Sequence, residues 1–231
     1  MRSVKTIFMD YDGTIHDWDG VFKRSLNGVL GLSGEEFFDI WTYRIHRGII
    51  HQKYLDKHDN LEFHCQLLFE YLGESYDEKI SRKIIELLAE AQEKAKTMPE
   101  FFPDAIQTLR ELNENGYTFC LSTGTGVEQK AETMKKVFEI NFFSYLFSEP
   151  LLGYLKTEPE YYLNALQRVN VTPEKAISVG DTPLSDIRPA KLVNMRAIWL
   201  NRRGEKWPND VKVKPDFTVN TLLEVISLLS K

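Results

Sequence analysis

The sequence has no long hydrophobic run. No apolar stretch in its 231 residues approaches the roughly 18 residues that a membrane-spanning helix needs. A strand-like run begins almost at the first residue, which leaves no room for a signal peptide. Two cysteines, Cys65 and Cys120, are too few for a disulfide framework. These absences predict a cytoplasmic protein that has no membrane partner.

The sequence has fewer basic residues than acidic ones, 29 lysines and arginines against 34 aspartates and glutamates. The formal net charge is -5 at pH 7, whereas nucleic-acid-binding surfaces normally carry a basic stripe. We therefore expect no nucleic-acid partner, although a local cluster of donors can still hold a small anionic ligand. The hydrophobic content of 42% and charged content of 27% are typical of a globular protein. The composition is compatible with either a monomer or a homodimer.

The chain has two kinds of periodicity, and they predict two domains. Residues 17–98 read as helical throughout, and Ser33 and Glu36 form a capping box at the start of one helix. Before and after this block, apolar strands alternate with amphipathic helices, the pattern of an α/β fold whose parallel sheet is covered on both faces. We therefore predict a Rossmann-like core from residues 1–16 and 99–231, with residues 17–98 as an inserted all-helical cap domain. The expected strands of the core are residues 4–9, 117–122, 176–181, 196–201 and 216–219.

Polar residues gather where these expected strands end. They are Asp10, Asp12, Ser122, Thr123, Gly124, Asp181 and Asp186, and Lys156 lies in a loop between the second and third of these strands. Ligands of open parallel sheets bind outside the carboxyl ends of the strands. We therefore expect these side chains to form one cluster.

The chemistry of that cluster fits a phosphate site. Converging carboxylates repel one another unless a cation lies among them, and hard oxygen ligands suit Mg²⁺. A hydroxyl and backbone N–H groups at the start of a helix can hold an anion, and Lys156 adds positive charge. An ionised aspartate can attack phosphorus to form an aspartyl phosphate. A second aspartate can exchange the protons, and as an acid near neutral pH it needs a pKa raised well above about 3.9. Partial burial and neighbouring carboxylates predict such a rise.

Four motifs in this order resemble those of the haloacid dehalogenase (HAD) superfamily. They are the sequence DYDGT after a strand, a hydroxyl that ends a later strand, an isolated lysine, and the sequence GDTPLSD. The resemblance covers nearly all of the predicted core, and the helical block resembles the cap domain of that family.

The resemblance implies a role for each matched residue. Asp10 is the expected nucleophile, and Asp12 is the expected general acid/base, whose backbone carbonyl also binds the metal. Ser122 is expected to bind the phosphoryl oxygens and Lys156 to steady the developing charge. Asp181 is the third expected metal ligand, after Asp10 and Asp12, and Asp186 is expected to act on the metal from a second layer.

Two departures from the family pattern leave questions open. Proline often follows the motif lysine directly, whereas here it is delayed to Pro159. The motif hydroxyl is commonly followed by asparagine, whereas Thr123 follows Ser122. We favour Ser122 as the phosphate contact, with Thr123 as the alternative.

Asp12 selects among the activities of the family, because dehalogenases proper lack an aspartate there and P-type ATPases carry threonine. The sequence thus predicts a Mg²⁺-dependent phosphatase that acts on a small phosphorylated metabolite, a phosphomonoester, through a phosphoaspartate. A sugar-phosphate mutase on the same core is one alternative, and a non-catalytic binding or regulatory protein is another.

Two further features have competing interpretations. A basic group in the helical block either reads the substrate or forms a solvated helix face, and its members are Arg44, His46, Arg47, His51 and Lys53. The sequence GTGVEQ, which starts at Gly124, partly matches a dinucleotide-binding motif. It lacks the third glycine and the acidic strand end that this motif requires, so we expect no dinucleotide site.

Overall fold

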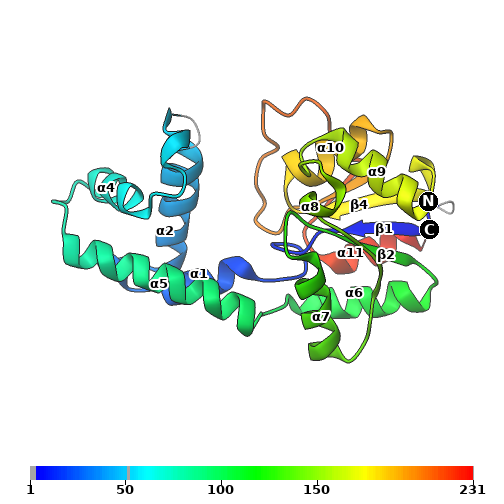
Figure 1. Ribbon diagram of the computed structural model, residues 1–231, viewed down its shortest axis with the longest axis horizontal. Coiled ribbons are helices and arrows are strands. Elements are labelled where there is room, and N and C mark those ends of the chain that lie inside the picture. Colours follow the sequence, from blue (N-terminus) through cyan, green and yellow to red (C-terminus); the bar gives the residue numbers. More distant parts are fainter. Residues whose placement is uncertain (1–3, 51–52, 231) are drawn as a thin grey trace. The chain divides into compact units, whose positions relative to one another are not determined.

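The computed structural model describes residues 4–50 and 53–230, which form two compact units. One unit is Asp17–Glu100, and the other consists of the described residues before and after it. Figure 1 shows a helical unit and a unit built around a sheet. Within the part of the chain that the structure describes, no helix combines the length and apolarity needed to cross a bilayer.

The sheet has six strands in the order β3-β2-β1-β4-β5-β6, and every neighbouring pair is parallel. The strands are β1 (Thr6–Met9), β2 (Thr118–Ser122), β3 (Phe143–Phe147), β4 (Ala176–Gly180), β5 (Arg196–Leu200) and β6 (Phe217–Val219). This arrangement confirms the predicted α/β fold with a parallel sheet. β3 was not anticipated. It is an edge strand with two exposed residues, so its sequence lacks the continuous apolar run of the central strands.

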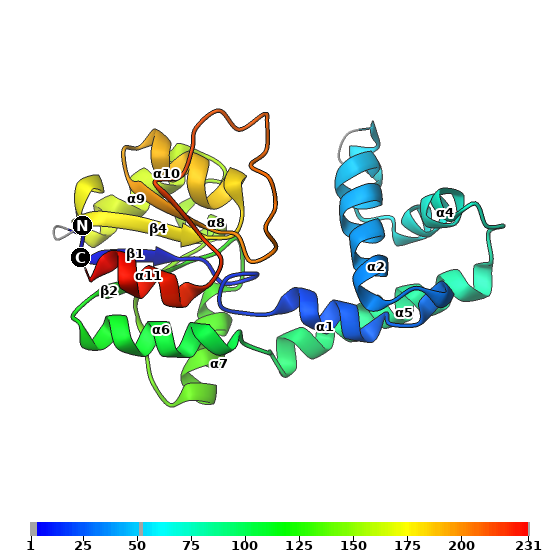
Figure 2. The same ribbon diagram turned by 180° about the vertical axis from the view of Figure 1, so that it is seen from behind.

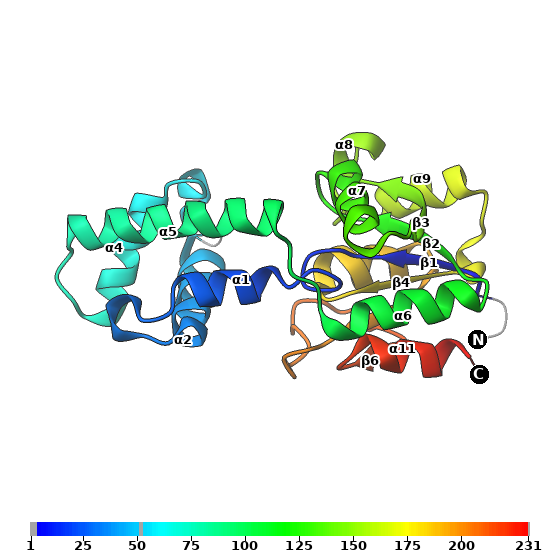
Figure 3. The ribbon, with the colours of Figure 1, turned by 90° about the horizontal axis from the view of Figure 1, so that it is seen from below.

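Helices cover both faces of the sheet (Figure 1). One layer contains α6 (Pro103–Glu114), α7 (Val127–Phe138) and α11 (Leu222–Leu229). The other contains α8 (Glu149–Leu152), α9 (Pro159–Val169) and α10 (Arg188–Leu192). In the first layer α6 and α11 lie side by side (Figure 3). The two layers enclose two separate apolar cores.

The alternation of side chains along β1 determines which core each residue joins. Ile7 and Met9 pack with α6, α7 and α11, whereas Phe8 between them packs with α9 and α10. All three are fully buried, and each such side chain stabilises the fold by about 1.5–3 kcal/mol relative to exposure. Because the strand is buried on both faces, it reads as a continuous apolar run up to Asp10.

The helical unit contains four α-helices in its described part (Figure 2). They are α1 (Trp18–Ser25), α2 (Gly34–Phe38), α4 (Leu61–Leu72) and α5 (Glu78–Thr97), and α2 continues as a wider π-helical coil through Asp39–Ile50. The predicted capping box of Ser33 and Glu36 is present at the start of α2. Phe22, Phe37, Trp41 and Leu68 lie in the core of the unit.

The helical periodicity of residues 17–98 did not show that a separate helix, α4, begins at Leu61. The side chain of Asn60 accepts a hydrogen bond from the backbone N–H of Phe63, at 3.0 Å. Asparagine favours this N-cap position over a helix interior. The apolar periodicity therefore does not reveal that Asn60 ends one segment and caps the next helix, α4.

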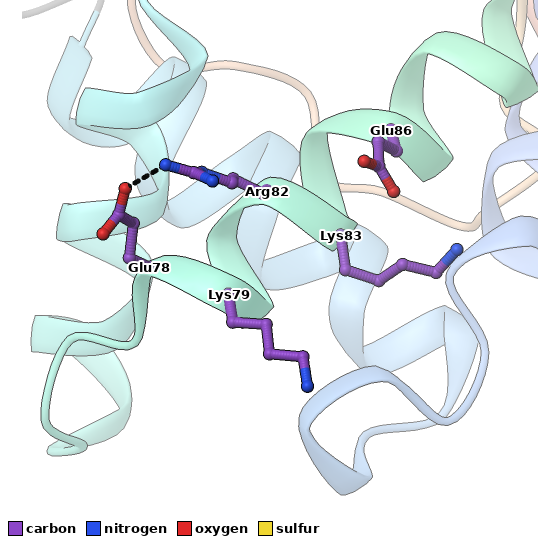
Figure 4. Close-up of a pocket in the computed structure, with 5 residues that line it drawn as sticks. All are labelled: Glu78, Lys79, Arg82, Lys83 and Glu86. Atoms are coloured by element: carbon purple, nitrogen blue, oxygen red, sulfur yellow. Dashed lines mark hydrogen bonds and ion pairs between the residues drawn. The ribbon is translucent and has the colours of Figure 1, made fainter.

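A hollow runs along one charged face of α5, and Figure 4 shows the side chains that line it. They are Glu78, Lys79, Arg82, Lys83 and Glu86, all from this helix. Glu78 and Arg82 form an ion pair one turn apart, an exposed contact that adds little stability. The hollow carries both signs of charge and contains none of the predicted site residues. We interpret it as a solvated helix face.

Candidate active site

Asp10, Lys156 and Asp186 meet at the carboxyl end of β1. The Nζ of Lys156 lies 2.5 Å from Oδ1 of Asp10 and 2.6 Å from Oδ1 of Asp186. It also donates a hydrogen bond to the backbone carbonyl of Ser122, at 2.8 Å. All three charged side chains are buried. The structure therefore places one ammonium between two carboxylates, inside the protein.

The charges in this group shift the pKa values of Asp10 and Lys156. Burial and the nearby Asp186 raise the pKa of Asp10 from 3.8 to about 7, although Lys156 acts in the opposite direction. Burial alone would lower the pKa of Lys156, but the charges of Asp10 and Asp186 outweigh it and hold that pKa well above its usual range. With both carboxylates ionised, the group carries one uncompensated negative charge, which a cation would balance.

Asp181 completes a set of oxygen donors. Asp10, Asp181 and Asp186 can each offer one carboxylate oxygen, and these three oxygens lie within 4.8 Å of one another. Such hard, anionic donors fit Mg²⁺. Asp186 belongs to this carboxylate group, so a direct contact with the metal is an alternative to the second-layer role, which stays a prediction. Its side chain also accepts a hydrogen bond from the backbone N–H of Thr182, at 2.8 Å.

Gly13 brings the loop after β1 against Asp181. Its φ is +79°, a conformation that side chains rarely adopt. A Cβ atom at this position would lie only 2.4 Å from Oδ2 of Asp181. The glycine of the DYDGT motif is therefore required both for the turn and for the close approach of the loop to this carboxylate.

The side chain of Asp12 has partners outside this carboxylate group. Its Oδ1 lies 2.8 Å from Nδ1 of His16, and its Oδ2 lies 2.7 Å from Nζ of Lys130. Burial would raise the pKa of Asp12, but the hydrogen bonds and charge of His16 and Lys130 outweigh it and hold the pKa below its usual value. The expected upward shift is therefore wrong for this state of the protein. Asp12 is an ionised carboxylate that is held at both oxygens.

Ser122 and Thr123 face opposite layers of helices. Ser122 is the last residue of β2, and its hydroxyl contacts the phenol of Tyr161 in α9, at 3.2 Å. The hydroxyl of Thr123 accepts a hydrogen bond from Lys130 in α7, at 2.8 Å. Side chains alternate along a strand, and this explains why the two adjacent hydroxyls have different partners. Gly124 follows in the loop, where its carbonyl accepts from the backbone N–H of Glu149, at 2.9 Å. The phosphate-binding role of all three residues stays a prediction.

Three residues of this region were missed by the sequence interpretation. Thr14 donates a hydrogen bond from its hydroxyl to Oδ2 of Asp10, at 3.1 Å, and His16 and Lys130 hold Asp12. Lys130 had a usable signal, because it lies in the first turn of a helix that starts at the carboxyl edge of the sheet. Long side chains in a helix point back toward its N-terminus.

The basic group predicted in the helical block is only partly described. Arg44 and Lys53 are exposed, whereas Nδ1 of His46 lies 2.9 Å from Nε2 of the buried His64. His51 and the side chain of Arg47 lie outside the described residues. Binding of substrate by this group stays a prediction.

Comparison with known proteins agrees with this geometry. Residues 4–194 match the family model of haloacid dehalogenase-like hydrolases. A phosphoserine phosphatase from Thermus thermophilus is 30% identical over 65% of this chain, a match that spans 64% of that enzyme. A glyceraldehyde 3-phosphate phosphatase from Pyrococcus furiosus is 27% identical over 100% of this chain and 95% of its own.

The fold has solved counterparts as well. The HAD-hydrolase YfnB from Bacillus subtilis, solved bound to magnesium, superimposes with a TM-score of 0.70 at 18% identity, over 100% of both chains. This likeness shows a shared fold, and the match over residues 4–194 establishes the family. The chain belongs to the haloacid dehalogenase-like hydrolases.

Proposed function

We propose that this protein is a Mg²⁺-dependent phosphatase that hydrolyses a small phosphomonoester through a phosphoaspartate on Asp10. The observation that carries the proposal is the buried contact between Asp10 and Lys156, with carboxylate oxygens of Asp181 and Asp186 in range of a shared cation. A carboxylate nucleophile beside fixed positive charge is the arrangement that phosphoryl transfer requires.

The reaction has two steps at Asp10. A carboxylate oxygen of Asp10 attacks phosphorus, the ester P–O bond breaks, and the leaving oxygen takes a proton. Water then attacks the same phosphorus, loses a proton, and releases inorganic phosphate and free Asp10. Lys156 offsets the negative charge that develops in both steps, and the hydrogen bond from Thr14 orients the Asp10 carboxylate.

A magnesium ion held by Asp10, Asp181 and Asp186 would offset the repulsion between these carboxylates and the incoming phosphate. Asp12 is the residue that exchanges protons with the leaving group and with the attacking water. In the state that the structure describes, its lowered pKa keeps it ionised, so Asp12 takes up a proton before it protonates the leaving oxygen and then accepts one from the attacking water.

The names of the relatives support a substrate class. They are named for phosphoserine and glyceraldehyde 3-phosphate, each a short carbon chain with one phosphate ester. We propose a substrate of this kind, a small phosphorylated metabolite. The helical block of residues 17–98 is proposed to act as a cap domain that selects it.

Removal of the metal tests the proposal most directly. With Mg²⁺, we expect phosphate release from p-nitrophenyl phosphate and from at least one of phosphoserine, glyceraldehyde 3-phosphate, phosphoglycolate or a hexose phosphate. A chelator should lower the rate about 100-fold or more, and excess Mg²⁺ should restore it, because the carboxylates then face the phosphate dianion without a counter-charge.

The controls separate the parts of the proposal. Full activity in the presence of chelator would exclude the metal and leave the phosphatase intact. Release of no phosphate from any ester would exclude the phosphatase. Conversion of a hexose phosphate to its isomer without phosphate release would instead identify a mutase.

A pair of substitutions decides between the two hydroxyls at the end of β2. Thr123→Val should lower kcat/KM about tenfold or more. The hydroxyl of Thr123 accepts a hydrogen bond from Lys130 in the first turn of α7, at the carboxyl edge of the sheet where we propose that the phosphate binds. The sequence favoured Ser122 as the phosphate contact, but its hydroxyl contacts Tyr161 in α9. We therefore now expect Ser122→Ala to leave kcat/KM nearly unchanged and to lower the unfolding free energy by about 1 kcal/mol, through the lost contact with Tyr161. Steady-state kinetics and thermal melts of both variants measure this. The reverse ranking of kcat/KM would make Ser122 the phosphate contact.

A further inference from the structure

Lys130 is tied to the candidate site by three groups. Its Nζ donates to Oδ2 of Asp12 at 2.7 Å and to the hydroxyl of Thr123 at 2.8 Å, and it lies 5.1 Å from the centre of the Tyr11 ring. Lys135, on the same helix, is exposed. Lys130 is therefore held in place, unlike an ordinary surface lysine.

The fold itself directs Lys130 to this position. α7 begins at Val127, and the backbone N–H of Lys130 donates to the carbonyl of Gly126, at 3.0 Å, so the residue belongs to the first helical turn. Side chains of a helix point back toward its N-terminus. The N-terminus of α7 follows the end of β2, where Thr123 lies. The ammonium thus reaches the carboxyl edge of the sheet.

The contacts of Lys130 and His16 fix both oxygens of one carboxylate. His16 is buried and follows Asp12 in the same loop, whereas Lys130 comes from a separate helix. His16 alone would leave the carboxylate attached to its own loop. Lys130 is the contact that ties Asp12 to α7 and, through the shared ammonium, to the hydroxyl of Thr123.

We propose that Lys130 is a positioning residue, which holds the Asp12 carboxylate beside Thr123 so that proton exchange takes place next to the bound phosphoryl group. This inference rests on the proposed phosphatase activity. It assigns a role to a residue outside the four motifs. Lys130 acts through Asp12 and needs no contact with the substrate.

Leaving-group dependence distinguishes this role from a purely structural one. An alkyl phosphate leaves as a strongly basic alkoxide, so its departure needs a proton from a well-placed acid. p-Nitrophenyl phosphate leaves as a stabilised phenolate and needs little or no such help. For both substrates, kcat/KM reports steps up to and including the first irreversible one. A misplaced Asp12 should therefore slow the alkyl phosphate selectively.

The experiment compares Lys130→Met with Lys130→Arg and with the matched control Lys135→Met. For Lys130→Met, kcat/KM should fall about tenfold or more for the best alkyl phosphate of the wild type, since small errors in position have effects of this size. For p-nitrophenyl phosphate it should change less than about threefold. Lys130→Arg should recover much of the loss, because an arginine can donate to both Oδ2 of Asp12 and the hydroxyl of Thr123. Lys135→Met should match the wild type with both substrates.

The other outcomes contradict either the positioning role or the proposed function. An equal fall with both esters would mean that Lys130 binds the phosphoryl group, and unchanged values with both would mean that it has no role; either result overturns the positioning role. A wild type without activity on either ester would refute the proposed function itself. Thermal melts establish that each variant is folded, and if Lys130→Met is not, Lys130→Gln replaces it under the same criteria.

Discussion

Asp10→Asn is expected to abolish turnover and, without metal, to make the protein more stable. The activity should fall about 10⁴-fold or more, because an amide cannot form the phosphoaspartate. The stability should rise by about 1–3 kcal/mol above neutral pH, because the variant removes the uncompensated charge and leaves one carboxylate paired with one ammonium. For a chain of this length that gain corresponds to a rise in Tm of several degrees.

The gain in stability of Asp10→Asn over the wild type should increase as the pH rises. The pKa of Asp10 is raised from 3.8 to about 7 in the folded protein, so between these values the folded state holds a proton that the unfolded state has lost. The folded wild type therefore loses stability, relative to the unfolded chain, as pH rises through this window. Asparagine has no such titration. The difference in Tm between Asp10→Asn and the wild type should increase from about pH 5 to about pH 8.

Thermal melts in the presence of a chelator, over that range of pH, measure the effect. Asp210→Asn, an exposed residue of the sheet-containing unit, is the matched control and should change neither activity nor the pH dependence. A variant that melts below the wild type at pH 8 would show that the bond from Lys156 to Asp10 outweighs the burial of its charge. Residual turnover near the wild-type rate would exclude Asp10 as the nucleophile.

Lys156→Met should have the second large effect, a loss of both activity and stability. Without the ammonium, Asp10 and Asp186 face each other in a buried site with no counter-charge. Removing one partner of a buried ion pair destabilises proteins by about 3–5 kcal/mol. Activity should fall about 10³-fold or more because charge that develops on the phosphoryl group is no longer offset.

Two measurements tie this loss to the carboxylates. Mg²⁺ should raise the Tm of Lys156→Met more than it raises that of the wild type, since the ion replaces part of the missing charge. The double variant Asp10→Asn with Lys156→Met should be more stable than Lys156→Met alone, and a double-mutant cycle gives the coupling energy. If both substitutions simply add, the two charges do not interact as the 2.5 Å contact indicates.

Sequence periodicity predicted five of the six strands of the sheet, including the edge strand β6, and missed β3. β1, β2 and β4 lie at or near the centre of the sheet and read as continuous apolar runs. β3 was missed because its two exposed residues, Ser144 and Tyr145, interrupt the apolar pattern. The start of α4 was also missed, because the apolar period does not reveal that Asn60 caps a new helix.

The sequence by itself determined that carboxylates, hydroxyls and a lysine follow successive strands. Because parallel strands end at the same edge, this order was enough to bring Asp10, Asp186 and Lys156 together. The tertiary structure alone decided which partner each side chain has. A strand turns adjacent residues to opposite faces, which separates Ser122 from Thr123, and a helix directs Lys130 back to Asp12. The pKa of Asp12 depends on those partners, since hydrogen bonds and charges act over a few ångströms in space and not along the chain.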